Sequence, residues 1–471
     1  MHNNRSYAPP LSIQRIIKDA MVIMCLLLLN KAGDPGTVVF FLILAGMALR
    51  SSTSAFKALA ICCLSIFLNK AFVPSSAIQT PARLILPFIC FARFLYDLPW
   101  LRSSDFFSSR VALTLYCLTM AVCSVMSGWY TNIALLKLLN FWIVLMTIFS
   151  GMAIIQKRGI DTTEWFISLI TATVFLGFAA IILGQGYNAI PGSGLFNGAF
   201  NHPNCYSNFG SLSLIFLMTA WVFGLYRNRH WLILMALSIV IFMILSKSRT
   251  SVAAMITGMA TIFFYSTPLR DHLDRLRHTN ISRGAILILA IVLVMGVVVY
   301  DIASNKAFSK AAKGFANKNN ETTSDETDTL DFEKVILSRI GTIENRFTNF
   351  RKNPIFGIGF QVSADPYFIE NATLFSAPVE KGFLPTAILE EGGVVGAIAF
   401  IIFIATLIGE LARRRNAAGI IMLCAFLASN FSEVTIFSMG GSGTFCWMMV
   451  GAAIIMSDHC WRRTGQHAKV S

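Results

Sequence analysis

The sequence predicts an all-α polytopic membrane protein with about 12–14 transmembrane helices and one large, partly helical periplasmic loop. Of the 471 residues, 55% are hydrophobic and only 13% are charged, about half the charged fraction of an average soluble domain. The apolar residues fall in runs of about 15–25, each long enough to cross a bilayer as a helix. These features exclude a cytosolic enzyme, a disordered protein and an ordinary nucleic-acid-binding domain.

Fourteen apolar stretches are candidate spans, and the first two are short enough that twelve spans also fit. They are roughly 17–31, 37–50, 55–73, 83–99, 110–128, 132–155, 165–185, 205–226, 231–246, 250–267, 285–303, 383–411, 417–431 and 436–458. No small-residue cleavage site follows the first stretch, which favours an uncleaved span. The chain therefore divides into an N-terminal bundle of about 11 spans (1–303), a loop (304–382), about three C-terminal spans (383–458) and a tail (459–471).

The basic residues orient these spans. The net charge is 38 − 24 = +14, which in a soluble protein would indicate nucleic-acid binding but here indicates basic cytoplasmic loops. With the N-terminus in the cytoplasm, every second loop is basic, as in Lys157-Arg158, Arg227 with Arg229, Arg413-Arg414-Arg415 and Arg462-Arg463. We therefore expect both termini in the cytoplasm and 304–382 in the periplasm. No CxxC or Cys/His cluster has metal-ligand spacing. No cofactor is expected.

Four polar groups lie at the non-cytoplasmic ends of the spans. In the first, the turn before the eighth span, Asn201, His202 and Asn204 would face the periplasmic end of the bundle. Asn204 or Ser207 would cap the following helix. The alternative interpretation is that these residues form only a turn and a helix cap.

The second group contains two cations, Lys247 and Arg249, on either side of Ser248. They stand at a membrane face where basic residues are uncommon. One interpretation is that their side chains reach toward lipid headgroups. The other is that they bind a phosphate or pyrophosphate through the guanidinium fork of the arginine.

The third group lies in the second half of the loop. Arg339 and Arg346 are seven residues apart and would share one helix face, and Pro354 would end that helix. Gly357 and Gly359 would then permit a close approach of the backbone to the membrane or to a ligand. The alternative is a solvated surface helix held by salt bridges.

The fourth group is acidic. Glu380 stands just before the twelfth span, and Glu390 and Glu391 stand inside it, where ionisable residues are costly and often functional. The alternative is that this span begins near Gly392, which would leave both carboxylates in a re-entrant or interfacial segment. Several arginines beside carboxylates at one membrane face suit an anionic, lipid-linked substrate.

The ordered set of motifs resembles the bacterial O-antigen ligase and O-antigen polymerase superfamily. That family has a Phe/His-Pro-Asn turn, a Ser-x-Ser-Arg at a periplasmic helix end, and a large loop with Ser-Arg, Pro and Gly-x-Gly that closes with Glu-x-Gly-x-x-Gly. The matching residues lie between about 195 and 400: Phe200 to Asn204, Ser246 to Thr250, Ser338-Arg339 to Pro354, Gly357-Ile358-Gly359, and Glu391 to Gly396.

The resemblance implies a metal-independent glycosyl transfer at the bacterial inner membrane from an undecaprenyl-diphosphate-linked oligosaccharide. It places Arg249 and Arg339 at the positions of the family's essential arginines, where they would stabilise the charge of the leaving diphosphate. A chain-length regulator, other polysaccharide-assembly proteins and membrane lipid are the expected partners, and nucleic acid is not.

One departure favours a polymerase. Lipid A-core ligases carry His-Asn ahead of the closing motif, where this chain has Glu380-Lys381, and no histidine occurs from 303 to 382. The expected function is therefore the joining of lipid-linked repeat units into exopolysaccharide, capsule or O-antigen, with a ligase as the alternative. A flippase or transporter of lipid-linked sugars is the alternative from another class, and a structural membrane partner is a further one. Glu391, Glu380, Glu390 or His202 would serve as the general base.

Overall fold

The structure is a computed structural model of the chain. It describes residues 11–74, 76–97, 106–187, 196–226, 229–246, 249–265, 345–362, 383–430, 434–439 and 442–467. For residues 207, 249–253, 264–265 and 458–467 it describes the backbone alone. The predicted span 285–303 and the predicted site residues Arg339, Glu380, Lys247 and Ser248 lie outside the described residues.

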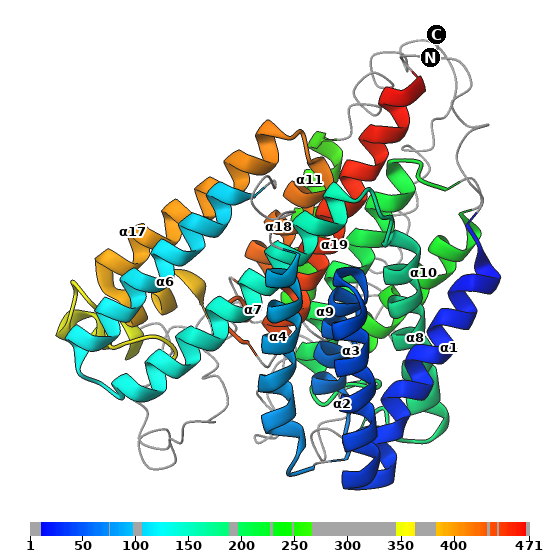
Figure 1. Cartoon of the computed structure of the whole chain (residues 1–471), viewed down its shortest axis with the longest axis horizontal. Helices are drawn as coiled ribbons and strands as arrows, with labels where there is room; N and C mark the ends of the chain where they lie inside the picture. The colour runs from blue at the N-terminus through cyan, green and yellow to red at the C-terminus, as the bar shows by residue number, and fades with distance from the viewer. Residues whose placement is uncertain are drawn as a thin grey trace, which may run out of the picture.

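The described residues form an α-helical bundle (Figure 1), which confirms the predicted fold class. The helices are α1 (Ile13–Leu28), α2 (Gly33–Arg50), α3 (Ser52–Phe67), α4 (Gln79–Tyr96), α6 (Phe107–Ser127), α7 (Thr131–Lys157), α8 (Thr163–Ile182), α9 (Pro203–Val222), α10 (His230–Leu245), α11 (Arg249–Tyr265), α17 (Leu384–Arg413), α18 (Ala417–Ser429) and α19 (Ser442–His467). The 3-10 turn η2 (Leu29–Ala32) joins α1 to α2, and residues 345–352 are also helical.

Six described stretches are long and apolar enough to cross a membrane: Ile13–Arg50, Phe107–Ser127, Thr131–Lys157, Thr163–Ile182, Pro203–Val222 and Leu384–Arg413. The first contains two helices, α1 and α2, which fold back on each other through η2 (Figure 1). Several shorter apolar helices complete the bundle. Each predicted span apart from 285–303 overlaps one helix, because the apolar runs that span a bilayer also form the helices.

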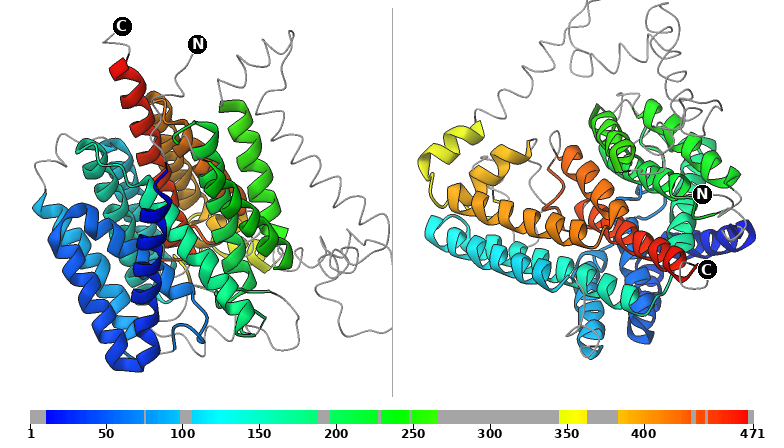
Figure 2. Two further views of the ribbon diagram at one scale, coloured as in Figure 1. Left: turned by 90° about the vertical axis from the view of Figure 1, so that its right-hand side faces the viewer. Right: turned by 90° about the horizontal axis from the view of Figure 1, so that it is seen from above.

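Helices α6 and α17 run side by side and project from the rest of the bundle (Figures 1 and 2). Gly392 and Gly396 allow α17 to approach α6 closely, since a Cβ atom at either glycine would lie within 2.8 Å of the Met120 sulfur. The start of α17 lies beside the end of α18, where the Leu384 amide donates to the Asn430 carbonyl at 3.1 Å. Helix α17 carries Glu390 and Glu391, two members of the acidic group of the sequence.

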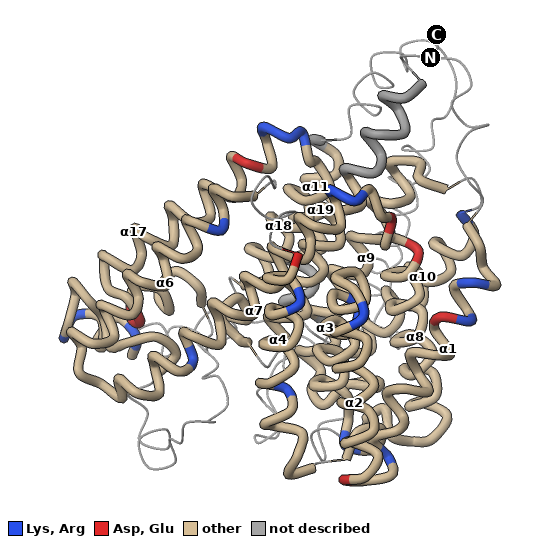
Figure 3. The backbone as a smooth tube through the Cα atoms, in the orientation of Figure 1, with Lys and Arg blue, Asp and Glu red and all other residues tan. Residues whose placement is uncertain are grey.

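Charged residues are sparse along the helices and gather mostly near their ends (Figure 3). We call the end that holds the α6–α7 turn, the segment 345–362 and the start of α9 the loop end. The opposite end holds Asp97, Arg158 and Glu410, where the Ser109 hydroxyl donates to Glu410 at 2.6 Å. The predicted topology puts the loop end in the periplasm.

Several predicted span boundaries differ from the helices, and the structure gives the reason for two of them. Span 436–458 was expected to begin six residues earlier than α19 does, at Ser442. The Asn430 side-chain oxygen accepts hydrogen bonds from the amides of Thr435 and Ile436, at 2.7 and 2.8 Å, and so holds these apolar residues in a buried turn. Span 55–73 ends early because α3 stops at Phe67 and Leu68 pairs with Phe200 in an isolated β-bridge.

Candidate functional site

Helix α17 is interrupted at Gly393, whose backbone angles are φ 59° and ψ −158°. In an uninterrupted helix, the Val394 and Val395 amides would donate to the carbonyls four residues earlier, at Glu390 and Glu391. The interruption removes both of these bonds. It leaves two N–H groups and two C=O groups that need other partners, because unpaired backbone groups are costly in a membrane.

Residues 354–359 supply all four partners. Their hydrogen bonds are Val394 N to Pro354 O (2.9 Å), Val395 N to Ile355 O (3.2 Å), Ile358 N to Glu390 O (2.8 Å) and Gly359 N to Glu391 O (3.0 Å). We call this arrangement the splice, because a loop segment completes the backbone pairing of a broken helix. The splice fixes the segment 345–362 against α17.

Two glycines make the splice possible. Gly357 has φ +68°, and a Cβ atom there would lie 2.6 Å from the Glu390 oxygen, the Glu391 carbonyl carbon and the Gly393 nitrogen. A Cβ atom on Gly393 would lie 2.3 Å from the Ile355 oxygen. A close backbone approach at Gly357 and Gly359 is therefore present, and it is made to α17.

The Glu390 carboxylate ties the helix 345–352 to α17. Arg346 Nη1 lies 2.8 Å from Glu390 Oε2, and Asn349 Nδ2 donates to Glu390 Oε1 at 2.9 Å. The side chains of Arg346 and Glu390 are only 11% and 3% exposed. The helix ends before Asn353-Pro354, as predicted. The alternative of a solvated surface helix held by salt bridges is met in part: most residues of this helix are exposed, but Arg346 forms its salt bridge with a buried carboxylate.

The segment continues into the bundle past the splice. The Phe360 amide donates to the Ser124 hydroxyl at 3.1 Å, and Lys137 Nζ donates to the Gln361 carbonyl at 3.0 Å. The Phe360 ring is fully buried and lies 5.4 Å from that of Phe141 and 5.5 Å from that of Phe437. Residues 357–362 are buried and are therefore part of the packed core as well as part of the predicted loop.

Glu391 is 2% exposed and lies one residue from the carboxylate that Arg346 holds. The structure thus brings together the third and fourth groups of the sequence: Arg346, Pro354, Gly357 and Gly359 with Glu390 and Glu391. The sequence left open whether this span contains both carboxylates or begins only near Gly392. The structure has features of both, since helix α17 begins at Leu384 but is broken at Gly393. The site joins a cationic loop helix to buried carboxylates at the loop end.

The turn before α9 lies at the same end of the bundle. His202, not Asn204 or Ser207, is the N-cap, and its Nδ1 accepts from the Asn204 amide at 3.2 Å. The prediction of the cap was wrong because the helix begins at Pro203, a residue suited to the first helical turn. Asn201 is exposed, and its amide donates to the Phe67 carbonyl at 2.6 Å. Arg249, described by its backbone, is the first residue of α11.

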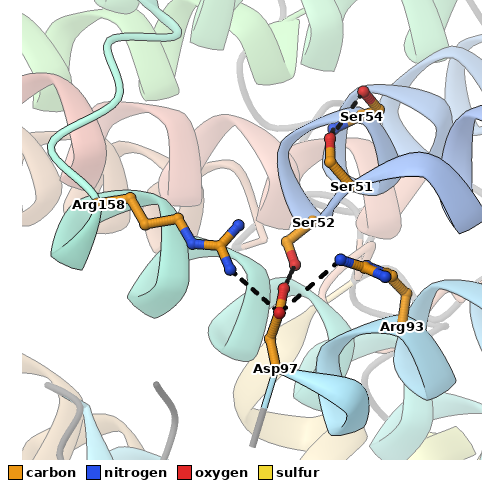
Figure 4. Close-up of polar contacts among 6 residues, drawn as sticks. All are labelled: Ser51, Ser52, Ser54, Arg93, Asp97 and Arg158. Atoms are coloured by element: carbon orange, nitrogen blue, oxygen red, sulfur yellow. Dashed lines mark hydrogen bonds and ion pairs between the residues drawn. The ribbon is translucent and has the colours of Figure 1, made fainter. Parts of the chain in front are cut away.

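Sequence reasoning missed two polar groups. Lys137 stands inside predicted span 132–155, and a charged residue within a span is itself a signal of function. At the opposite end, Asp97 accepts a hydrogen bond from the Ser52 hydroxyl and pairs with Arg158 at 3.0 Å and Arg93 at 3.8 Å (Figure 4). The Asp97 cluster joins α3, α4 and α7, and its sequence signal is the i,i+4 pair of Arg93 and Asp97.

In the part of the chain that the structure describes, no group of three or more His, Cys, Asp or Glu side chains could hold a metal ion. The chemistry of the described site is that of an arginine–carboxylate pair, a buried second carboxylate and a fixed backbone turn.

The fold and this site define a polytopic helical membrane protein with a hydrophilic loop anchored in its bundle. Residues 233–401 match the family model described as O-antigen ligase, which supports the assignment of the chain to the O-antigen ligase/polymerase superfamily. The match includes α10, α11, the splice and Glu391, and the turn before α9 lies outside it. The comparison with curated proteins gave no match.

Proposed function

We propose that the protein is an inner-membrane polymerase that joins undecaprenyl-diphosphate-linked repeat units on the periplasmic face. The family match supports a transfer of this general type. The observation that carries the choice of polymerase is the absence of histidine from 303 to 382, where Glu380-Lys381 replaces the His-Asn of ligases. The product would be exopolysaccharide, capsule or O-antigen.

In the proposed reaction, an acceptor sugar hydroxyl attacks the anomeric carbon of the lipid-linked glycan. The new C–O glycosidic bond forms as the C–O bond to the diphosphate breaks, and undecaprenyl diphosphate leaves with the bonding electron pair. The hydroxyl proton passes to a carboxylate or to water. Arg249 and Arg339 would stabilise the charge that grows on the diphosphate, the main requirement for such a leaving group.

The buried carboxylates supply the candidate proton acceptor. Glu391 is our first choice, because it begins the closing motif and is buried beside the splice. Glu380, which lies outside the described residues, is the second choice. Asn201, His202, Asn204, Lys247 and Ser248 are proposed to contact the substrate from the neighbouring turns. Replacing Glu391 and Glu380 by Gln in turn, with His202→Ala as the comparison, identifies the acceptor from the lengths of the chains formed.

A ligase is the second candidate function, since the matching family model carries that description. A bacterial strain that lacks this chain separates the two. Loss of a polymerase leaves single repeat units on the lipid carrier and removes long chains. Loss of a ligase leaves chains of normal length on undecaprenyl diphosphate and removes them from lipid A-core. We expect the first result, and the second would contradict the polymerase proposal.

A further inference from the structure

Both carboxylate oxygens of Glu390 are engaged by one helix of the loop segment. Oε2 pairs with Arg346 and Oε1 accepts from Asn349, and both donors come from the helix 345–352. These donors stand three residues apart, so they lie on the same face of that helix. Glu390 therefore fixes the rotation of the helix as well as its position on α17.

The backbone of Glu390 is fixed independently of its side chain. Its carbonyl accepts the Ile358 amide at 2.8 Å within the splice. The same residue thus binds the loop segment at two places, residues 346–349 through the carboxylate and residue 358 through the backbone. Because the backbone of Glu390 is fixed in the splice, its carboxylate is suited to hold the helix 345–352 in place.

We propose that Glu390 is a positioning residue for the glycosyl transfer, which acts by docking the helix 345–352 onto α17 through Arg346 and Asn349. This inference rests on the proposed function and assigns different tasks to two adjacent carboxylates. Glu390 holds the loop segment, and Glu391 remains the candidate proton acceptor. The substrate-binding role expected for Arg346 from the sequence stays a prediction, and in the structure its guanidinium pairs with Glu390.

Paired substitutions test this division of tasks. The variants are Glu390→Gln, Arg346→Gln and the double variant R346Q/E390Q, with Lys352→Glu on the exposed face of the same helix as the matched control. Each full-length protein is reconstituted in nanodiscs. Hydrogen exchange of the amides of 345–358 reports docking, and polymer formation from lipid-linked repeat units reports activity.

Positioning predicts strong coupling between the two residues. Each single variant should speed exchange in 345–352 and lower kcat by about tenfold or more, because each leaves one buried partner of the pair without the other. The double variant should be no worse than either single variant, since it removes both charges together. Lys352→Glu should leave exchange within 345–352 unchanged.

Other results would overturn the proposal. A catalytic Glu390 predicts that Glu390→Gln abolishes turnover while exchange in 345–352 stays at the wild-type rate. Additive losses in the double variant would show that the two side chains act separately. If the wild-type protein forms no polymer, the proposed function fails, and the exchange data still decide whether Glu390 docks the helix.

Discussion

The splice predicts that Gly357→Ala is far more damaging than a matched glycine substitution nearby. Gly357 and Gly128 have nearly the same positive φ, +68° and +70°. A Cβ atom on Gly128 meets nothing within 4 Å, whereas one on Gly357 meets three backbone atoms of α17 at 2.6 Å. Comparing Gly357→Ala with Gly128→Ala therefore separates the cost of a left-handed conformation from the cost of losing the backbone contacts with α17.

The magnitude of each effect follows from these contacts. The left-handed conformation costs an alanine about 1–2 kcal/mol at either position. At Gly357 the Cβ atom touches backbone, so a change of side-chain rotamer cannot relieve the clash and the splice must open. Four hydrogen bonds worth about 1 kcal/mol each would be weakened or lost. The expected cost is therefore up to about 6 kcal/mol for Gly357→Ala against about 1–2 kcal/mol for Gly128→Ala.

Thermal unfolding of the detergent-solubilised protein, followed by fluorescence-detected size exclusion, measures this difference. Gly357→Ala should lower the apparent Tm by several degrees more than Gly128→Ala. Hydrogen exchange should rise at Ile358, Gly359, Val394 and Val395, whose amides donate in the splice. Equal Tm values for the two variants, with unchanged exchange at these amides, would refute the splice as described.

Three further predictions concern other parts of the chain. Asp97→Asn should lower the free energy of unfolding by about 3 kcal/mol, because it leaves Arg93 and Arg158 facing each other, whereas Ser52→Ala should cost only about 1 kcal/mol in the same thermal assay. Arg249→Ala should abolish polymer at normal protein levels and Arg249→Lys should restore little, because lysine lacks the bidentate fork; full activity of the lysine variant would contradict the phosphate role. A cysteine introduced at Ser324 should react with an impermeant reagent in intact cells, and labelling only after the membrane is broken would reverse the predicted topology.

Much of the fold could be predicted from the sequence, because a local run of apolar residues indicates a membrane helix. The predicted spans thus overlap the described helices from α1 to α19. The errors arise where a specific polar contact decides the structure. Asn430 holds Thr435 and Ile436 out of α19 through contacts that no hydropathy pattern reveals.

The candidate site could be predicted in part. The residue types at Arg346, Gly357 and Glu391 indicated a functional region, and the close approach of glycine backbone was expected. The identity of the approaching partner was not, because the hydrogen bonds of the splice join residues about 30–40 positions apart in the sequence. The pairing of Arg346 with Glu390 likewise depends on that long-range register.

The central claim, polymerisation of lipid-linked repeat units, is tested most directly with the purified protein in liposomes. The liposomes carry undecaprenyl-diphosphate-linked repeat units and no other protein, and mass spectrometry measures chain lengths and free undecaprenyl diphosphate together. We predict a ladder of chains that grows by whole repeat units, with one undecaprenyl diphosphate released for each new linkage. Unchanged single units, or lipid diphosphate released without chain growth, would contradict the claim.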